Sequence, residues 1–141
     1  MLGIDYSPQS ISLAEQVAEQ AELEDPPQFK TWDILNGPLE DVGTEWDVIL
    51  DKGTFDAISL SEENDAQGRR LNEGYRERAL QVLKKGGLFL ITSCNWTEEE
   101  LTNWFVDGEG GFQVAGRVNY PSFSFGGVKG QTISTLCFKK T

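Results

Sequence analysis

Residues 46–56, Trp-Asp-Val-Ile-Leu-Asp-Lys-Gly-Thr-Phe-Asp, give the clearest indication of the fold. They begin with an almost continuous apolar run, which is typical of a strand covered on both faces in a parallel sheet. This run ends at Asp51. Two earlier strand-like runs also end at an acid, Asp5 in the first and Asp33 in the second. The sequence therefore predicts three strands with an aspartate at the carboxyl end of each.

Apolar residues at helical spacing predict helices between the strands. A Ser-Pro start predicts a helix over residues 8–23. A second apolar stripe predicts a helix over residues 71–83 that is stopped by Gly86–Gly87. Thr97 opens a capping box and predicts a third, shorter helix. Helices thus alternate with strands along most of the chain.

The second half of the chain completes the sheet. Residues 88–92 predict a fourth strand, and residues 112–120 and 132–138 predict two more with no helix between them. Successive strands of this kind usually pair antiparallel. The expected fold is α/β, a Rossmann-like, mostly parallel sheet with an antiparallel carboxy-terminal strand pair. With 141 residues, a single domain over residues 1–141 is expected.

Composition excludes several classes of function. The chain has no histidine, which removes Ser-His-Asp and Cys-His catalysis and most zinc sites. A formal net charge of −11 repels phosphate backbones and anionic membranes, so neither nucleic acid nor a membrane is an expected partner. No metal site is expected. A basic protein is the more compatible partner.

Other features of the sequence favour a soluble, cytoplasmic protein. No segment approaches the roughly 20 apolar residues of a membrane span, and the first residues lack the features of a signal peptide. Cys94 and Cys137 lie far apart in apolar stretches, which predicts two structural thiols in a reducing compartment.

The strand-end acids predict a nucleoside site. In open α/β sheets, ligands bind outside the carboxyl ends of the strands. Asp5 offers two carboxylate oxygens to the two hydroxyls of a ribose. Asp33 can accept the exocyclic amine of adenine, while the backbone amide of Ile34 contacts a ring nitrogen. Taken singly, each acid is equally well explained as a cap of the element that follows it.

One expected part of such a site does not occur in the chain. A glycine-rich loop should precede the first acid, between an earlier strand and helix. Gly86–Gly87 is better explained as a helix stop, and Gly126–Gly127 comes too late. Two explanations are open: the chain lacks its amino-terminal part, or the nucleoside interpretation is wrong.

Four segments resemble a known family, the seven-strand protein-lysine methyltransferases, and in particular the branch that modifies elongation factor 1-alpha. They are Leu-Gly-Ile-Asp-Tyr-Ser at 2–7, the run from Trp46 to Leu60, Leu-Phe-Leu-Ile-Thr-Ser-Cys-Asn-Trp-Thr at 88–97, and Phe-Ser-Phe-Gly-Gly at 123–127. The motif Asp-Lys-Gly-Thr at 51–54 is the most specific. This resemblance implies an amino-terminally truncated methyltransferase domain without its first strand and helix.

The resemblance also implies the cofactor, the partner and the roles of residues. It implies S-adenosyl-L-methionine as cofactor, elongation factor 1-alpha as protein substrate, and a monomer. Candidate catalytic residues are Asp51, Lys52 and Asn95. Candidate cofactor-binding residues are Asp5, Tyr6, Asp33, Ile34 and Asp51, and candidate substrate-binding residues are Gly53, Thr54, Phe55, Trp96, Phe123 and Phe125.

Simpler explanations stay open for several of these residues. Lys52 can pair with Asp51 or Asp56, or be an ordinary surface lysine. Trp96 can wall an acceptor channel or pack onto the following helix. Glu98–Glu100 is more typical of a helix start than of a docking patch. For the whole chain, the alternatives are a catalytically inactive partner-binding module and a nicotinamide-dependent enzyme on a related sheet, which the closing strand pair disfavours.

Overall fold

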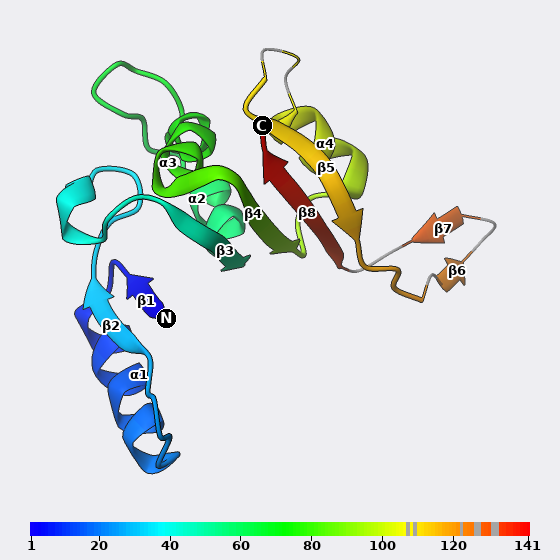
Figure 1. Cartoon of the computed structure of the whole chain (residues 1–141). Coiled ribbons are helices and arrows are strands. Elements are labelled where there is room, and N and C mark those ends of the chain that lie inside the picture. Colours follow the sequence, from blue (N-terminus) through cyan, green and yellow to red (C-terminus); the bar gives the residue numbers. More distant parts are fainter. Residues whose placement is uncertain (107, 109, 122, 126–127, 131–132) are drawn as a thin grey trace. The chain divides into compact units, whose positions relative to one another are not determined.

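The computed structural model describes residues 1–106, 108, 110–121, 123–125, 128–130 and 133–141. These residues form two compact units, residues 1–43 and residues 44–141 (Figure 1). Within the described residues, the structure contains no helix long and apolar enough to cross a membrane. Each unit has its own sheet and is described separately.

The first unit is a strand–helix–strand motif. Strand β1 (Leu2–Asp5) pairs parallel with β2 (Gln28–Thr31), and α1 (Pro8–Gln20) connects them. Ser7 caps this helix, since its side chain accepts a hydrogen bond from the amide of Ser10, 3.3 Å away. The predicted helix is therefore confirmed, although it ends at residue 20 instead of residue 23. A short 3₁₀ helix, Leu39–Asp41, follows β2.

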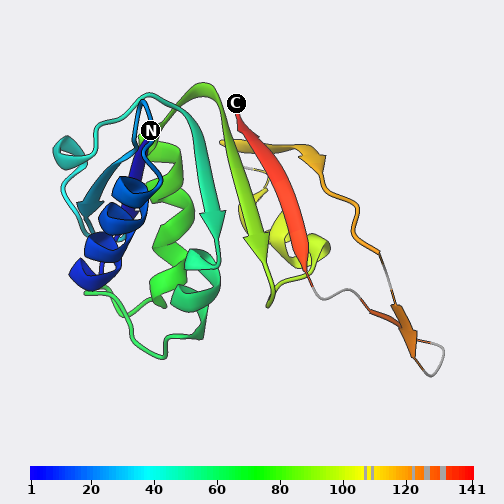
Figure 2. The ribbon, with the colours of Figure 1, turned by 90° about the horizontal axis from the view of Figure 1, so that it is seen from below.

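The second unit contains a four-stranded sheet in the order β3-β4-β8-β5. Strand β4 runs parallel to β3, while β8 runs antiparallel to both of its neighbours, as can be followed in Figures 1 and 2. The strand bounds are β3 Trp46–Lys52, β4 Leu83–Ser93, β5 Phe112–Arg117 and β8 Ser134–Lys140. The α/β, Rossmann-like class and the antiparallel closing pair are confirmed, and the later strand of that pair lies inside the sheet.

Three α-helices accompany this sheet. They are α2 (Thr54–Leu60), α3 (Tyr75–Val82), which is preceded by the 3₁₀ helix Leu71–Gly74, and α4 (Glu98–Phe105). The capping box at the start of α4 is present as predicted. A separate antiparallel pair consists of β6 (Phe123–Phe125) and β7 (Val128–Gly130).

Aromatic rings fill the space between the helices and one face of the sheet. Phe55, Tyr75 and Phe105 come from the helices, and Phe89 and Phe138 come from the strands; each is at most 1% exposed. The ring of Phe105 lies at the centre, with centroids 5.2 Å from those of Phe55 and Phe89 and 5.3 Å from that of Phe138. Such pairs add stability beyond the burial of apolar area.

The opposite face of β3 is not covered as expected. Val48 is 47% exposed and Leu50 is 68% exposed, whereas Asp51 on the helix-covered side is buried. The prediction that both faces of this strand are covered is wrong for this structure. All three α-helices of the second unit pack on the face that bears Phe89 and Ile91, so the apolar run overstated the burial of the strand.

The prediction of a helix stop at Gly86–Gly87 is also wrong. Helix α3 already ends at Val82, and β4 begins at Leu83. The pairing between β3 and β4 jumps from Leu83 to Leu88, so the intervening residues form an irregular stretch of strand. Gly86 has φ +79°, a left-handed conformation that glycine adopts without strain and that such a bulge requires.

We predict that replacing the central ring Phe105 by alanine lowers the free energy of unfolding of the second unit by about 3–5 kcal/mol, because the cavity cannot be filled by its aromatic neighbours. Urea denaturation followed by circular dichroism measures this change. The matched control Leu50→Ala, on the exposed face of β3, should cost less than about 1 kcal/mol. Equal losses for the two variants would contradict this assignment of the core.

Candidate functional site

Asp5 lies at the carboxyl end of β1 and is half-buried. Its Oδ1 accepts the amide of Ser7 at 2.8 Å, which shapes the turn into α1. Its backbone carbonyl accepts the amide of Trp32 at 2.8 Å, which continues the parallel pairing with β2. Among the described residues, no hydrogen bond to Oδ2 is found. Asp5 therefore orders the turn with one oxygen while the other retains its capacity to accept donors.

Asp33 lies two residues beyond Thr31, the pairing partner of Asp5, so the two acids follow the same edge of the β1–β2 pair. Asp33 is exposed. Its Oδ1 accepts the amide of Leu35 at 2.8 Å, and its Oδ2 accepts the side-chain amide of Asn36 at 3.0 Å. Each carboxylate oxygen can accept a further donor. Asp5 and Asp33 thus lie along one sheet edge, as predicted.

The turn after β2 is built on Trp32, which is only 5% exposed. Its ring nitrogen donates to the carbonyl of Pro38 at 2.9 Å, and the amide of Gly37 donates to the carbonyl of Asp33 at 2.7 Å. Ile34 is half-buried in this turn, whereas Tyr6, after β1, is 80% exposed. The edge thus combines a rigid turn with an exposed aromatic ring.

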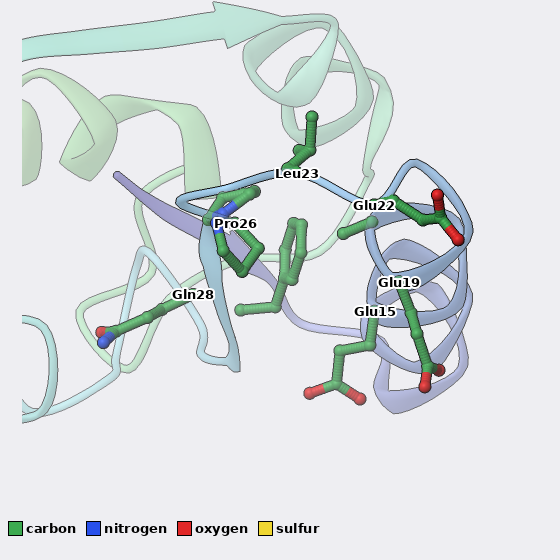
Figure 3. A pocket seen from close by; sticks show the side chains of 9 residues that line it. Glu15, Glu19, Glu22, Leu23, Pro26 and Gln28 are labelled. Atoms are coloured by element: carbon green, nitrogen blue, oxygen red, sulfur yellow. The ribbon is translucent and has the colours of Figure 1, made fainter.

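A separate hollow of about 600 Å³ lies between α1 and β2. Figure 3 shows Glu15, Glu19 and Glu22 on the helix side, and Pro26 and Gln28 on the strand side. Its size is within the range of small-molecule sites. None of the predicted cofactor-binding residues lines it, so the hollow is not the strand-end site that the sequence predicts.

Asp51, at the carboxyl end of β3, is 5% exposed and receives three hydrogen bonds. Oδ1 accepts the amide of Thr54 at 2.8 Å, and Oδ2 accepts the amide of Phe55 at 3.1 Å. The phenol of Tyr75 also donates to Oδ2. The first turn of α2 is therefore fastened to the end of β3 by a single carboxylate.

The environment of this carboxylate changes the acidity of both partners. Burial raises the pKa of Asp51 above the usual range of an aspartate, and the hydrogen bonds from Tyr75, Thr54 and Phe55 offset this effect only in part. Burial, followed by the charge of Asp51, raises the pKa of Tyr75 well above the usual range of a tyrosine. The phenol consequently remains a hydrogen-bond donor.

Gly53 makes the sharp corner between β3 and α2. It has φ +86°, a conformation that strains any residue with a Cβ atom, and its amide donates to the carbonyl of Thr92 at 3.2 Å. Lys52 and Thr54 on either side are exposed. The hydrogen-bond donors to Asp51 and to Asp56 come from other residues, so the structure favours the alternative of a surface lysine at position 52 over its pairing with either acid.

The loop after β4 lies at the same sheet edge as this corner, since Lys52 pairs with Thr92. Asn95 in this loop is exposed, and Trp96 is half-buried. The ring of Trp96 lies 5.3 Å, centroid to centroid, from those of Phe55 and Trp104. Trp96 thus packs onto the helix that follows it and onto α2. The structure therefore brings together the 51–54 corner and the 95–96 loop within the second unit.

Sequence reasoning missed the residue that holds this loop. Asp56 in α2 is only 8% exposed, and its carboxylate accepts the hydroxyl of Ser93 and the amide of Cys94. The available signal was a second acid five residues after Asp51, on a segment that was not expected to be helical. Cys94 itself is exposed, which corrects the prediction of a buried thiol, whereas Cys137 is partly buried.

Three of the predicted substrate-binding residues are phenylalanines. Phe55 is fully buried, so its ring supports Trp96 and does not face solvent. The backbones of Phe123 and Phe125 lie in β6, and their side chains are outside the described part of the chain. Gly126–Gly127, the end of the same motif, also lies outside it.

Comparison with known proteins gives a family match and several relatives. A family model for a methyltransferase domain matches residues 1–119. The chain is 42% identical over 139 residues to the protein-lysine N-methyltransferase efm4 of Schizosaccharomyces pombe, covering 99% of this chain and 57% of that protein. It is 42% identical over 138 residues to the human EEF1A lysine methyltransferase 2, covering 98% and 55%. The chain thus spans a little over half the length of these relatives.

Solved structures with similar folds have low sequence identity. An S-adenosylmethionine-dependent methyltransferase from Clostridium acetobutylicum superimposes with a TM-score of 0.68 at 15% identity, covering 98% of this chain and 74% of that chain. The N-methyltransferase NodS from Bradyrhizobium japonicum, in complex with S-adenosyl-L-homocysteine, gives 0.66 at 14% identity, covering 99% and 65%. These similarities establish the fold alone.

We predict that Tyr75→Phe raises the pKa of Asp51 further, because it removes a hydrogen bond that favours the carboxylate. Carbon-13 NMR titration of the Asp51 carboxyl group measures this shift. Loss of a hydrogen bond to a buried charge should also lower the free energy of unfolding at neutral pH by about 1.5–3 kcal/mol.

The pH dependence of stability follows from the same shift. Since the folded pKa of Asp51 lies above its unfolded value of about 3.9, the folded state binds more protons than the unfolded state in the pH interval between these two values. The contribution of Asp51 to stability therefore falls as the pH rises through it, and Tyr75→Phe should enlarge the fall. Tyr120→Phe, which removes a hydroxyl 2.9 Å from that of Thr135, is the control and should leave the Asp51 titration unchanged. An unchanged pKa of Asp51 in Tyr75→Phe would contradict the hydrogen bond between Tyr75 and Asp51.

Proposed function

The chain belongs to the methyltransferase domain family, and on that premise we propose that it is an S-adenosylmethionine-dependent protein-lysine N-methyltransferase acting on translation elongation factor 1-alpha. The observation that carries the proposal is the 42% identity, over nearly the whole chain, to proteins named as lysine methyltransferases. One of these names specifies EEF1A as the protein that is methylated. The Asp51–Thr54 corner and the Asn95–Trp96 loop supply a candidate acceptor site.

We also propose that residues 1–141 form one methyltransferase domain. The family model covers residues 1–119 and thus includes the first unit and most of the second, which supports this proposal. Because the chain spans 55–59% of three relatives, the activity of the complete protein is part of the proposal.

The β1–β2 edge fits the nucleoside part of the cofactor. Asp5 has an oxygen available for ribose hydroxyls, and Asp33 retains acceptor capacity for the amine of adenine. Ile34 lies in the turn that follows Asp33, and the exposed ring of Tyr6 is suited to cover a planar or sugar group. When bound, S-adenosylmethionine supplies an electrophilic methyl group on its sulfonium. These residues have the task of binding and orienting it.

The corner and loop of the second unit are suited to receive an amine. A lysine with a pKa of about 10.4 must lose its proton, at a cost of about 4–5 kcal/mol near neutral pH. The exposed side-chain carbonyl oxygen of Asn95 can accept an N–H and so orient the nitrogen lone pair for methyl transfer. Trp96, Gly53 and Thr54 line the approach, and Lys52 is available on the surface beside them.

Asp51 contributes to this site through the corner that it holds. Its oxygens already accept two amides and a phenol, so we propose that it fixes the path of Gly53 and Thr54 rather than exchanging a proton with the substrate. The buried ring of Phe55 packs against the ring of Trp96. Phe123 and Phe125 remain proposed contacts to the protein substrate.

The proposal extends to partners and location. The net charge of −11 favours a basic protein substrate over nucleic acid or an anionic membrane. We propose a monomer that acts in the cytoplasm, where a translation factor is available as substrate. No metal takes part in the proposed reaction, since direct displacement at a sulfonium requires none.

We predict that S-adenosylmethionine binds to the chain, or to the chain extended upstream through its genomic reading frame, and that Asp5→Asn weakens this binding roughly 10- to 150-fold. Such a loss corresponds to one hydrogen bond to a charged acceptor, about 1.5–3 kcal/mol. Isothermal titration calorimetry measures both. The control Asp25→Asn makes the same charge change at an exposed position of the same unit and should leave the affinity unaltered.

Three outcomes have different meanings. Binding together with methylation of purified elongation factor 1-alpha, detected by mass spectrometry of its lysine peptides, supports the enzyme. Binding of that factor without cofactor binding by either form favours the partner-binding module. If cofactor binds but Asp5→Asn and Asp25→Asn behave alike, the assignment of the ribose site is wrong.

A further inference from the structure

A buried carboxylate from one helix reaches across to the loop after β4. Asp56 lies in α2 and Ser93 ends β4, 37 residues later in the chain. The hydroxyl of Ser93 donates to Oδ1 of Asp56 at 2.5 Å, and the amide of Cys94 donates to Oδ2 at 2.8 Å. Ser93 is fully buried and Asp56 is 8% exposed. Both oxygens of the carboxylate are therefore used to hold the start of this loop.

The hydroxyl of Ser93 also holds the backbone of Asn95 and Trp96. It accepts the amide of Asn95 at 3.1 Å and the amide of Trp96 at 2.9 Å. A hydroxyl has one proton and two lone pairs. Because the backbone amides of Asn95 and Trp96 can only donate, they take the two lone pairs, and the hydroxyl proton points at Asp56.

This network holds the backbone that carries the side chains of Asn95 and Trp96. Asn95 projects to the surface from a backbone whose amide is held, and the ring of Trp96 rests against Phe55, the neighbour of Asp56 in α2. A chain of hydrogen bonds in a buried setting strengthens each of its members. Asp56 and Ser93 thus couple α2 to the loop without reaching the surface themselves.

We propose that Asp56 and Ser93 are positioning residues that hold Asn95 and Trp96 in the geometry needed to receive the acceptor lysine. The use of this geometry for methyl transfer rests on the proposed function, whereas the holding of the loop does not. Neither residue touches the substrate. Their loss should therefore weaken use of the protein substrate while leaving cofactor binding intact.

The first experiment measures the loop itself in the full chain. Fluorine-19 NMR of protein labelled with 5-fluorotryptophan, assigned with Trp96→Phe, reports on the Trp96 ring. In Asp56→Asn, one of the two bonds to Ser93 and Cys94 is lost because the side-chain amide nitrogen cannot accept. Asp56→Asn and Ser93→Ala should shift or broaden the Trp96 resonance.

The control for these variants lies in the same helix. Ser59 donates only within α2, to the carbonyl of Phe55 at 2.7 Å, so Ser59→Ala should leave the Trp96 resonance in place. A Trp96 resonance that is unchanged in folded Asp56→Asn would overturn the proposal. If the variants fail to fold, hydrogen exchange of the unmodified protein decides. The amides of Cys94, Asn95 and Trp96 should be protected, and rapid exchange of all three would overturn the proposal.

The second experiment separates the substrate from the cofactor. In the form of the protein that binds S-adenosylmethionine, Asp56→Asn and Ser93→Ala should raise the KM for the protein substrate about tenfold or more, with the Kd for cofactor changed less than about twofold. Ser93→Thr, which keeps the hydroxyl, should keep the KM for the protein substrate close to that of the unmodified protein. A purely structural role would change both constants together.

The two proposals can fail independently. If the loop measurements agree with expectation but no methyl transfer occurs, the proposed function fails and the loop network stands. If methyl transfer occurs and Asp56→Asn leaves the KM for the protein substrate unchanged, the positioning role fails and the proposed function stands.

Discussion

Two buried carboxylates, Asp51 at the end of β3 and Asp56 in α2, determine the shape of the candidate site in the second unit. Asp51 fastens the first turn of α2 to β3, and Asp56 fastens the same helix to the loop after β4. A carboxylate that has lost most of its water needs hydrogen-bond donors. The donors here come from the first turn of α2, from Tyr75, and from Ser93 and Cys94 at the end of β4. Helix α2 thus connects the end of β3 to the loop after β4, and the positions of Gly53, Asn95 and Trp96 depend on these connections.

The strand-end acids of the two units differ in burial, and this separates their chemical roles. In the first unit, Asp5 is half-buried and Asp33 is exposed; each orders a turn with part of its acceptor capacity, and the remainder is available. In the second unit, Asp51 is buried and accepts three hydrogen bonds from its own chain. The same residue type after a strand therefore keeps acceptor capacity at the surface in one case and gives internal support in the other, and burial decides between them.

Much of the fold could be predicted because its signals are local. The apolar runs before Asp5 and Asp51, the Ser-Pro start of α1 and the capping box at Thr97 each specify an element by themselves. Helix α2 could not be predicted in this way, since seven residues are too few to show a helical period, and its first turn is held by Asp51, which in turn accepts a hydrogen bond from the distant Tyr75. The strand bulge at Gly86 was mistaken for a helix stop because a positive φ serves both. For the candidate site, sequence placed Asp5, Asp33, Asn95 and Trp96 at strand ends, but burial, and with it the roles of Asp51 and Asp56, came only from tertiary contacts.

We propose that this chain binds the methyl donor at the carboxyl ends of β1 and β2. Backbone amide NMR during titration with S-adenosyl-L-homocysteine, the product that a methyltransferase releases, tests it most directly, in the chain or its upstream-extended form. We expect the amide resonances of Tyr6 and Ile34 to shift at saturation, while those of Glu15 and Glu19 beside the separate hollow should not. Saturable shifts confined to the hollow, or none in either form, would contradict the account.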